Sequence, residues 1–189
     1  MKIFFDTEFT GLHKNTTLIS IGLVDENDRC FYAEFTDYDE YYVDEWIKEN
    51  VIKNLKHKGA RDIHLKGYNP REDKTWVVGN KQEICTALYE WLLDYDRIEL
   101  VSDVCHYDMV LLIDIFGSAW DVPSPLNPSC HDINQDIANY YHISETEAFD
   151  KGREDIIAEH EKTVKGNKHN ALYDAKVIKE IYGILNNIT

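Results

Sequence analysis

The chain has 189 residues, of which 43% are hydrophobic and 29% are charged, a composition that excludes a disordered protein. No linker rich in Pro, Gly or Ser divides the sequence, so we predict one domain spanning residues 1–189. The net charge of −15 argues against broad electrostatic binding of long nucleic acid. It does not exclude a local nucleic-acid site, because the net charge counts acids that hold divalent cations but not the cations themselves.

The sequence carries no sign of export or membrane insertion. Lys2 is followed by only three apolar residues before Asp6 interrupts, and no apolar stretch approaches the length of a membrane span. We therefore expect a cytoplasmic protein. The four cysteines are widely scattered without a C-x-x-C pair, which predicts reduced thiols rather than a zinc cluster or a disulfide framework.

The first third of the chain predicts three β-strands. The apolar stem at residues 2–5 is the first, the alternating run at 17–24 is the second, and 30–35 is the third. A turn rich in Asp and Asn at 25–28 separates the last two strands. Because tight turns join antiparallel neighbours, these strands are expected to form an antiparallel meander.

Helical patterns follow the meander. Asp44 is a candidate N-cap for a helix that carries Ile47, Val51 and Leu55 at four-residue spacing. Over 56–80 the helical spacing of apolar residues is lost, and we expect a basic loop. This loop is either a solvated surface or a binding surface for a longer nucleic acid. Its basic residues are Lys56, Lys58, Arg61, Lys66, Arg71 and Lys74.

The second half of the chain predicts a crossover and then more helices. A helix at 81–93 leads to a short apolar strand at 98–101, which a crossover makes parallel to its neighbour in the sheet. From residue 107 onward the pattern is mostly helical, with a loop at 123–128 and a capping box at 144–147. Asp132 is expected to cap a helix. The predicted class is α/β, with a mixed sheet flanked by helices.

Two carboxylates follow the first strand, one residue apart. In a strand, Asp6 and Glu8 point to the same face, where like charges repel and burial without partners is costly. Cations, donors or a metal ion would make the pair tolerable. A simpler alternative, that the strand ends at Phe5 and both acids lie in solvent, stays open from this stretch alone.

A third acid follows the strand at 98–101. Among Asp103, Asp108 and Asp114, we favour Asp108, with Asp103 second, because Asp108 opens an apolar helix whose start faces the ends of the strands. The alternative is an ordinary acid at a helix N-terminus that holds no ligand.

The last informative stretch lies near the C-terminus. Asp174, Val177, Ile178 and Ile181 follow helical spacing, so an acid occupies the inward stripe where an apolar residue is expected. His169 lies five residues upstream, within reach of a water near Asp174. Taken alone, the two residues are equally compatible with a surface or capping pair.

Taken together, these stretches resemble the DEDDh family of 3′-to-5′ exonucleases. The residues 6–12, DTEFTGL, resemble the first motif of that family, Tyr107-Asp108 is similar to the second, and 169–175, HNALYDA, resembles the third. The motifs occur in the family order and cover most of the chain.

A narrower similarity is to a compact bacterial and phage exoribonuclease group with a mycobacterial member. It rests on the FFDTEF opening, the WIKENV helix at 46–51 and the YDMVLL stretch at 107–112. The resemblance implies a ribonuclease H-like fold with a five-stranded mixed sheet.

The resemblance also implies a chemistry that suits these residue types. Asp6, Glu8, Asp108 and Asp174 would hold two Mg²⁺ or Mn²⁺ ions, because hard cations prefer carboxylate oxygens, and His169 would take the proton from the attacking water. The contacts expected with the terminal nucleotide come from Thr7, Phe9, Leu12 and Tyr107.

The expected substrate is RNA, only because of the narrower similarity. The alternatives are an exodeoxyribonuclease acting on single-stranded DNA or 3′ overhangs, a non-catalytic RNA-binding module, and a metal-dependent phosphatase or endonuclease of the same fold. Many relatives are homodimers, so a second copy of the chain is a candidate partner.

Overall fold

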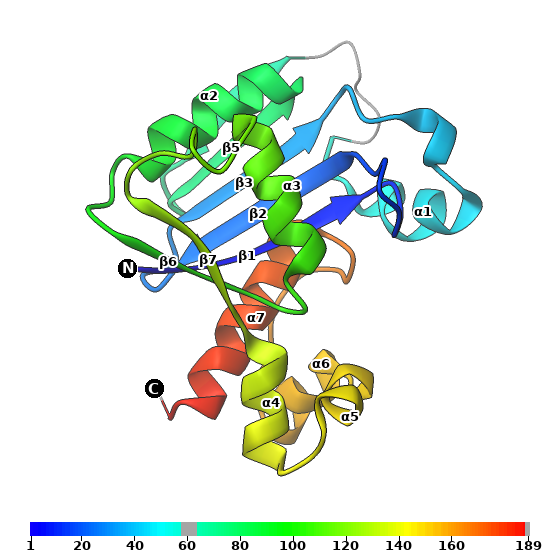
Figure 1. The fold of residues 1–189 in the computed structure, drawn as a ribbon, viewed down its shortest axis with the longest axis vertical. Helices are drawn as coiled ribbons and strands as arrows, with labels where there is room; N and C mark the ends of the chain where they lie inside the picture. Colours follow the sequence, from blue (N-terminus) through cyan, green and yellow to red (C-terminus); the bar gives the residue numbers. More distant parts are fainter. Residues whose placement is uncertain (58–63, 188–189) are drawn as a thin grey trace.

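The computed structural model describes residues 1–57 and 64–187, which form a sheet with helices on both faces (Figure 1). The sheet has seven strands in the order β4-β5-β3-β2-β1-β6-β7. Their bounds are β1 Lys2–Phe9, β2 Leu18–Asp25, β3 Cys30–Phe35, β4 Leu65–Asn69, β5 Lys74–Gly79, β6 Ile98–Ser102 and β7 Leu126–Asp132. The helices are α1 Glu45–Asn50, α2 Lys81–Leu92, α3 His106–Phe116, α4 Ile133–Tyr141, α5 Glu145–Asp150, α6 Arg153–Glu159 and α7 Ala171–Leu185.

The predicted meander and crossover are confirmed. β1 pairs antiparallel with β2, and β2 pairs antiparallel with β3. After α2, β6 joins the other side of β1 in parallel. The mixed α/β class predicted from the sequence is therefore correct.

The predicted number of strands, five, is wrong. β4 and β5 form a hairpin inside the stretch expected to be a basic loop, and β5 pairs in parallel with β3. The only apolar run there is Trp76-Val77-Val78, which was too short to predict a strand, yet Val77 and Val78 are buried against β3. Lys66 and Lys74 carry ion pairs to Glu90 and Glu72, and Lys58 and Arg61 lie outside the described residues.

The third missed strand is β7, at the other edge of the sheet. It begins inside the stretch predicted as a loop, 123–128, and continues into a stretch predicted as mostly helical. It pairs in parallel with β6, with a register irregularity between Ile98 and Leu100. Its residues are mostly polar and exposed, with Leu126 the buried one. Pro128 is tolerated there because an edge strand leaves one side of its backbone unpaired.

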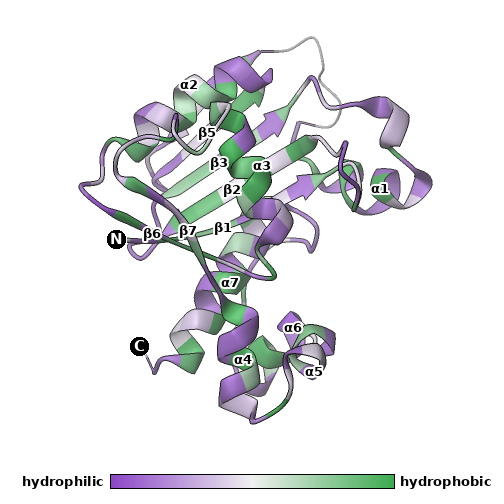
Figure 2. Cartoon of the chain, viewed as in Figure 1, coloured by the Kyte–Doolittle hydropathy of each residue, from purple (hydrophilic) through white to green (hydrophobic). Residues whose placement is uncertain are grey.

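Two hydrophobic layers pack on the two faces of the sheet. α2 and α3 cover the face that carries Ile3 and Phe5 of β1, whereas α7 and α4 cover the face that carries Phe4. Figure 2 shows hydrophobic residues concentrated along the central strands and along α3. Because strand side chains alternate, the β1 residues with even numbers, Asp6 and Glu8 included, continue the face on which α7 packs.

Several local predictions are confirmed and one is corrected. Asp44 caps α1 by accepting a hydrogen bond from the Ile47 backbone N–H, and Asp132 and Ser144 cap α4 and α5. Helix α1 ends at Asn50, and a 3₁₀ turn, Ile52–Asn54, carries the chain on. In the described part of the chain, no helix has the length and apolar character needed to cross a membrane.

Candidate active site

Strand β1 continues past Phe5 to Phe9, so Asp6 and Glu8 belong to an ordered strand rather than to a solvent-exposed exit. Asp6 lies opposite Gly22 of β2. A Cβ atom at Gly22 would lie 2.3 Å from the Leu172 backbone nitrogen, so the absence of a side chain allows the start of α7 to rest directly on the sheet. This close approach brings Asp174 to the two acids of β1.

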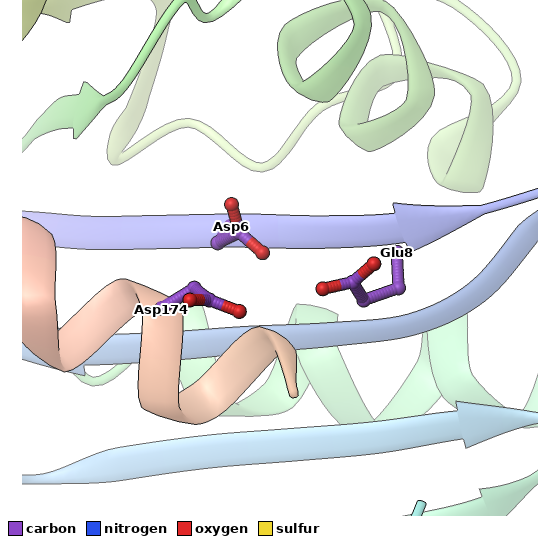
Figure 3. A group of neighbouring side chains, drawn as sticks. All are labelled: Asp6, Glu8 and Asp174. Atoms are coloured by element: carbon purple, nitrogen blue, oxygen red, sulfur yellow. The ribbon is translucent and has the colours of Figure 1, made fainter. Parts of the chain in front are cut away.

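Asp6, Glu8 and Asp174 form a group of converging carboxylates. They offer oxygens that all lie within 4.8 Å of one another, and Figure 3 shows the two β1 side chains beside Asp174 on α7. The set consists of hard oxygen donors from rigid elements, which is the donor chemistry that Mg²⁺ and Mn²⁺ prefer. The residues present therefore fit a divalent cation.

The protonation of this group reflects its crowding. Burial raises the pKa of Asp6 well above its usual range, and the charges of Asp108 and Asp174 raise it further. Burial also raises the pKa of Glu8, and it raises the pKa of Asp174 to about 7. Without a cation, burial and crowding disfavour full ionisation of the group, because the three carboxylates cannot all ionise cheaply so close together.

Asp108 lies beside the group, at the start of α3. Its Oδ1 accepts hydrogen bonds from the backbone nitrogen of Thr7, at 2.9 Å, and from the Thr7 Oγ1, at 2.5 Å. Burial raises the pKa of Asp108 to about 6, although the Thr7 hydrogen bonds lower it. Its charge raises the pKa values of Asp6 and Glu8, but it is not a member of the three-carboxylate group.

The other acids considered for this position have other partners. Asp103 forms a two-pronged ion pair with the Arg153 guanidinium, at 2.6 and 2.7 Å. Asp114 lies on the exposed side of α3 and pairs with Lys81 at 2.6 Å. The structure thus favours Asp108, which is hydrogen-bonded to Thr7, the residue between the two β1 acids.

His169 stands on the loop just before α7. Its backbone is left-handed, with φ of 60°, and its Nδ1 lies 4.0 Å from the Glu8 Oε1. The Trp46 ring meets the imidazole edge-on, with 5.0 Å between the centroids. Burial and the Lys168 charge lower the pKa of His169, so the imidazole is neutral at pH 7 and able to accept a proton.

A chain of amide hydrogen bonds fixes the loop that carries His169. The Asn54 side chain donates to the Lys168 carbonyl at 2.9 Å. The Asn170 side chain donates to the Asn54 carbonyl and to the Tyr32 hydroxyl, both at 3.1 Å. Since Asn170 and Tyr32 are buried, these bonds hold the unusual backbone of His169 from both sides.

These residues line one cavity of about 710 Å³, here called the active-site cavity. Its lining holds eight carboxylates and, apart from His169, three basic side chains, so it suits cations. Leu12, Trp46 and Phe149 also line it, and their side chains are more than half exposed. Exposed apolar surfaces beside a charged group suit a ligand that combines flat rings with phosphates.

The predicted nucleotide contacts occupy different positions. Leu12 and Phe9 line the active-site cavity, and the Phe9 ring stacks on Tyr107 with 5.3 Å between centroids. Thr7 is 4% exposed, and both its backbone N–H and its hydroxyl donate to Asp108. Thr7 therefore positions Asp108, and contact between these residues and a nucleotide stays a prediction.

Residues 1–185 match the Rv2179c-like 3′-5′ exoribonuclease domain, which is nearly the whole chain. The chain belongs to this family. Two Mycobacterium tuberculosis proteins, from strains H37Rv and CDC 1551, both named 3′-5′ exoribonucleases, are 32% identical to it over 125 residues. The aligned part is 65% of this chain and 66% of each relative, slightly less than two thirds of their length.

Solved structures show the same fold at low sequence identity. The nuclease domain of a 3′-exonuclease described as a DEDDh family member, bound to rAMP, has a TM-score of 0.65 and 13% identity, covering 98% of this chain and 91% of that one. Schizosaccharomyces pombe Pop2p in its Mg²⁺- and Mn²⁺-bound form has a TM-score of 0.61 and 16% identity, covering 98% and 82%. The predicted resemblance to the DEDDh exonucleases is confirmed.

For this member of the Rv2179c-like family, sequence patterns missed two features of the site. Trp46 stands in the stretch that suggested the narrower similarity, but its contact with His169 depends on the packing of α1 against the loop before α7. Arg153 reaches Asp103 across fifty positions of sequence, and no local pattern signals such a pair.

Proposed function

We propose that this Rv2179c-like chain is a metal-dependent 3′-to-5′ exoribonuclease that releases nucleoside 5′-monophosphates from the 3′ end of RNA. The observation that carries the proposal is the convergence of Asp6, Glu8 and Asp174, with His169 4.0 Å from Glu8 in one cavity. Membership of a family described as exoribonucleases, and relatives with that name, support the same activity.

Asp6, Glu8 and Asp174, with Asp108 beside them, would hold two divalent cations, Mg²⁺ or Mn²⁺. When bound, such ions neutralise charge on the phosphoryl oxygens and make a bound water more acidic. The burial of these carboxylates supports this proposal: burial raises all three pKa values, neighbouring acids raise those of Asp6 and Glu8 further, and a cation offsets both effects.

The role proposed for His169 is that of general base. Its lowered pKa keeps the ring neutral, so a ring nitrogen can take the proton from the attacking water while the bond to the leaving 3′ oxygen breaks. Trp46 and the Asn54–Asn170 hydrogen bonds hold the ring in place. The imidazole is one-third exposed on its side chain, so the proton can then pass to solvent.

The apolar surfaces of Leu12, Phe9 and Trp46 would receive the terminal base, while the carboxylate group faces its phosphate. The preference for RNA over DNA rests on the names of the family and its relatives. We also propose a homodimer, because many relatives are homodimers. Sedimentation of the purified protein tests this proposal.

The deciding experiment compares 5′-labelled single-stranded RNA, single-stranded DNA and a duplex with a 3′ overhang, each with and without Mn²⁺. We expect a ladder of shortened RNA and free mononucleotides, dependent on the metal and abolished by Asp6→Ala. Internal cuts would indicate an endonuclease, faster loss of DNA would indicate an exodeoxyribonuclease, and binding without hydrolysis would indicate a non-catalytic module.

A further inference from the structure

A second cavity of about 360 Å³ lies between the 3₁₀ turn after α1 and the loop before α7. Four lysines and three asparagines line it, and no carboxylate does so among the described residues. We call it the lysine cavity; its lysines are Lys53, Lys56, Lys165 and Lys176. The chain as a whole has 35 acidic and 20 basic residues, so this composition is opposite to that of the molecule.

The lysines of this cavity are short of counter-charges. Lys53 pairs with Glu49 at 3.0 Å, but Lys56, Lys165 and Lys176 have no carboxylate within ion-pair distance in the part of the chain that the structure describes. Burial lowers the pKa of Lys56, and the nearby charges of Lys74 and Lys176 lower it further, while the charge of Glu72 opposes them in part. Like charges gathered in one place repel, and an anion in the cavity would relieve that repulsion.

The walls of the lysine cavity are fixed by packing. A Cβ atom at Gly166, where φ is 147°, would lie 2.5 Å from the Tyr173 ring, so the loop rests directly on that aromatic side chain. The Lys56 ammonium lies over the Tyr32 ring, 5.4 Å from its centroid. The lysines therefore project from a preformed surface, which lowers the entropy cost of ligand binding.

The lysine cavity and the active-site cavity lie on either side of one bridge. Asn54 and Asn170 line the lysine cavity. Lys168, whose carbonyl accepts from Asn54, and His169, which precedes Asn170, line the active-site cavity. The bridge consists of the hydrogen bonds from Asn54 to the Lys168 carbonyl and from Asn170 to the Asn54 carbonyl. A chain that leaves the active-site cavity past Lys168 would thus meet the lysines next.

We propose that the lysine cavity binds backbone phosphates of the RNA strand upstream of the 3′ nucleotide that is being removed. This inference rests on the proposed exonuclease function, since it needs a strand end in the active-site cavity. Lysine ammonium groups bind phosphate as compact point charges, whereas the Asn54 and Asn170 amides already donate within the protein and leave the lysines as the donors. The site explains how a protein with a net charge of −15 holds a polyanion: the cationic contacts are concentrated beside the carboxylates.

The test compares a triple variant, Lys56→Gln with Lys165→Gln and Lys176→Gln, with a matched control. The control, Lys66→Gln with Arg97→Gln and Lys162→Gln, removes the same charge at exposed positions outside both cavities. Binding of a labelled RNA of about 16 nucleotides and of a dinucleotide is measured by fluorescence anisotropy against salt. Both triple sets are also placed in the Asp6→Ala background, so that no strand is degraded.

For the lysine-cavity variant, we expect the slope of log affinity against log salt for the long RNA to fall by about 2, since three phosphate contacts are lost at ~0.7 each. The advantage of the long RNA over the dinucleotide in kcat/KM should fall roughly tenfold. The control variant should keep both values, and circular dichroism should show that all variants are folded.

An unchanged slope and length advantage in the lysine-cavity variant would overturn the proposal, as would equal losses in the control. If inorganic phosphate binds in the wild-type lysine cavity but the length of the RNA has no effect on affinity or kcat/KM, the cavity binds a free anion. The assignment to backbone phosphates is then wrong. If the wild-type protein releases no mononucleotides, the exonuclease function fails instead, and the anisotropy data still report separately on the cavity.

Discussion

The close packing of α7 on β2 makes Gly22→Ala the most informative single substitution. The added Cβ would lie 2.3 Å from the Leu172 nitrogen and 2.4 Å from the carbonyl carbon of Ala171. These are backbone atoms, so the start of α7 has to move away by about 1 Å to reach an ordinary contact distance. Asp174 lies in the first turn of the same helix and has to move with it.

The expected loss of stability is that of an overpacked core, about 1–3 kcal/mol. For a chain of this size, that corresponds to a fall in melting temperature of roughly 2–12 °C. The expected loss of activity is larger in relative terms, since a displacement of about 1 Å at a reacting group can cost ~10²-fold. Both effects follow from one shift of α7.

The assay is kcat/KM for mononucleotide release from single-stranded RNA, measured well below the melting temperature of each variant and at saturating Mn²⁺. Gly117→Ala is the matched control: its φ of 96° makes alanine unfavourable, but the nearest atom to an added Cβ is 3.9 Å away and the residue lies outside the site. We expect Gly117→Ala to lose stability and keep kcat/KM within about twofold. A folded Gly22→Ala protein with wild-type kcat/KM would refute the reasoning.

Three further outcomes are expected. Mg²⁺ or Mn²⁺ at about 100 times its dissociation constant should stabilise the wild-type protein by roughly 2.7 kcal/mol, whereas the Asp6→Asn variant should gain little stability. A wild-type melting temperature that does not change with metal would contradict the carboxylate site. In chelator, stability from this group should fall as pH rises from about 4 to above 7, because the pKa values of Asp108 and Asp174 are raised to about 6 and about 7 and the folded state binds more protons than the unfolded state. The Asp174→Asn substitution should weaken the pH dependence of the melting temperature. An unchanged pH dependence would argue against a contribution from Asp174. His169→Gln should lower kcat by about 10²–10⁴-fold with the metal-induced rise in melting temperature retained, and a fully active variant would exclude the histidine as the base.

The carboxylates, the histidine and the central strands could be predicted because each leaves a local signal. The alternation in β2 and the apolar stem of β1 identified the meander, and Asp174 was conspicuous as an acid on an apolar helical stripe. The edge strands could not be predicted in this way. β4 and β7 bury few side chains, so the pairing of their backbones, which leaves no pattern in the residues, decides their structure.

Long-range partners account for the rest of what the sequence did not reveal. The family resemblance implied a nucleotide contact for Thr7, but no local pattern revealed that both of its donors bind Asp108, which is 101 positions away. Similarly, the role of Gly22 depends on a helix that begins near the other end of the chain. Such contacts exist only in the folded molecule.

The wide separation of Asp6 and Asp174 along the chain has a consequence for synthesis. Asp6 on β1 emerges from the ribosome before the rest of the sheet, but its partner Asp174 and His169 follow only after all seven strands have been made. A growing chain therefore has no complete cation site while it is still close to the messenger RNA that encodes it. For the proposed activity, the order of translation itself delays hydrolysis until helix α7 has been made.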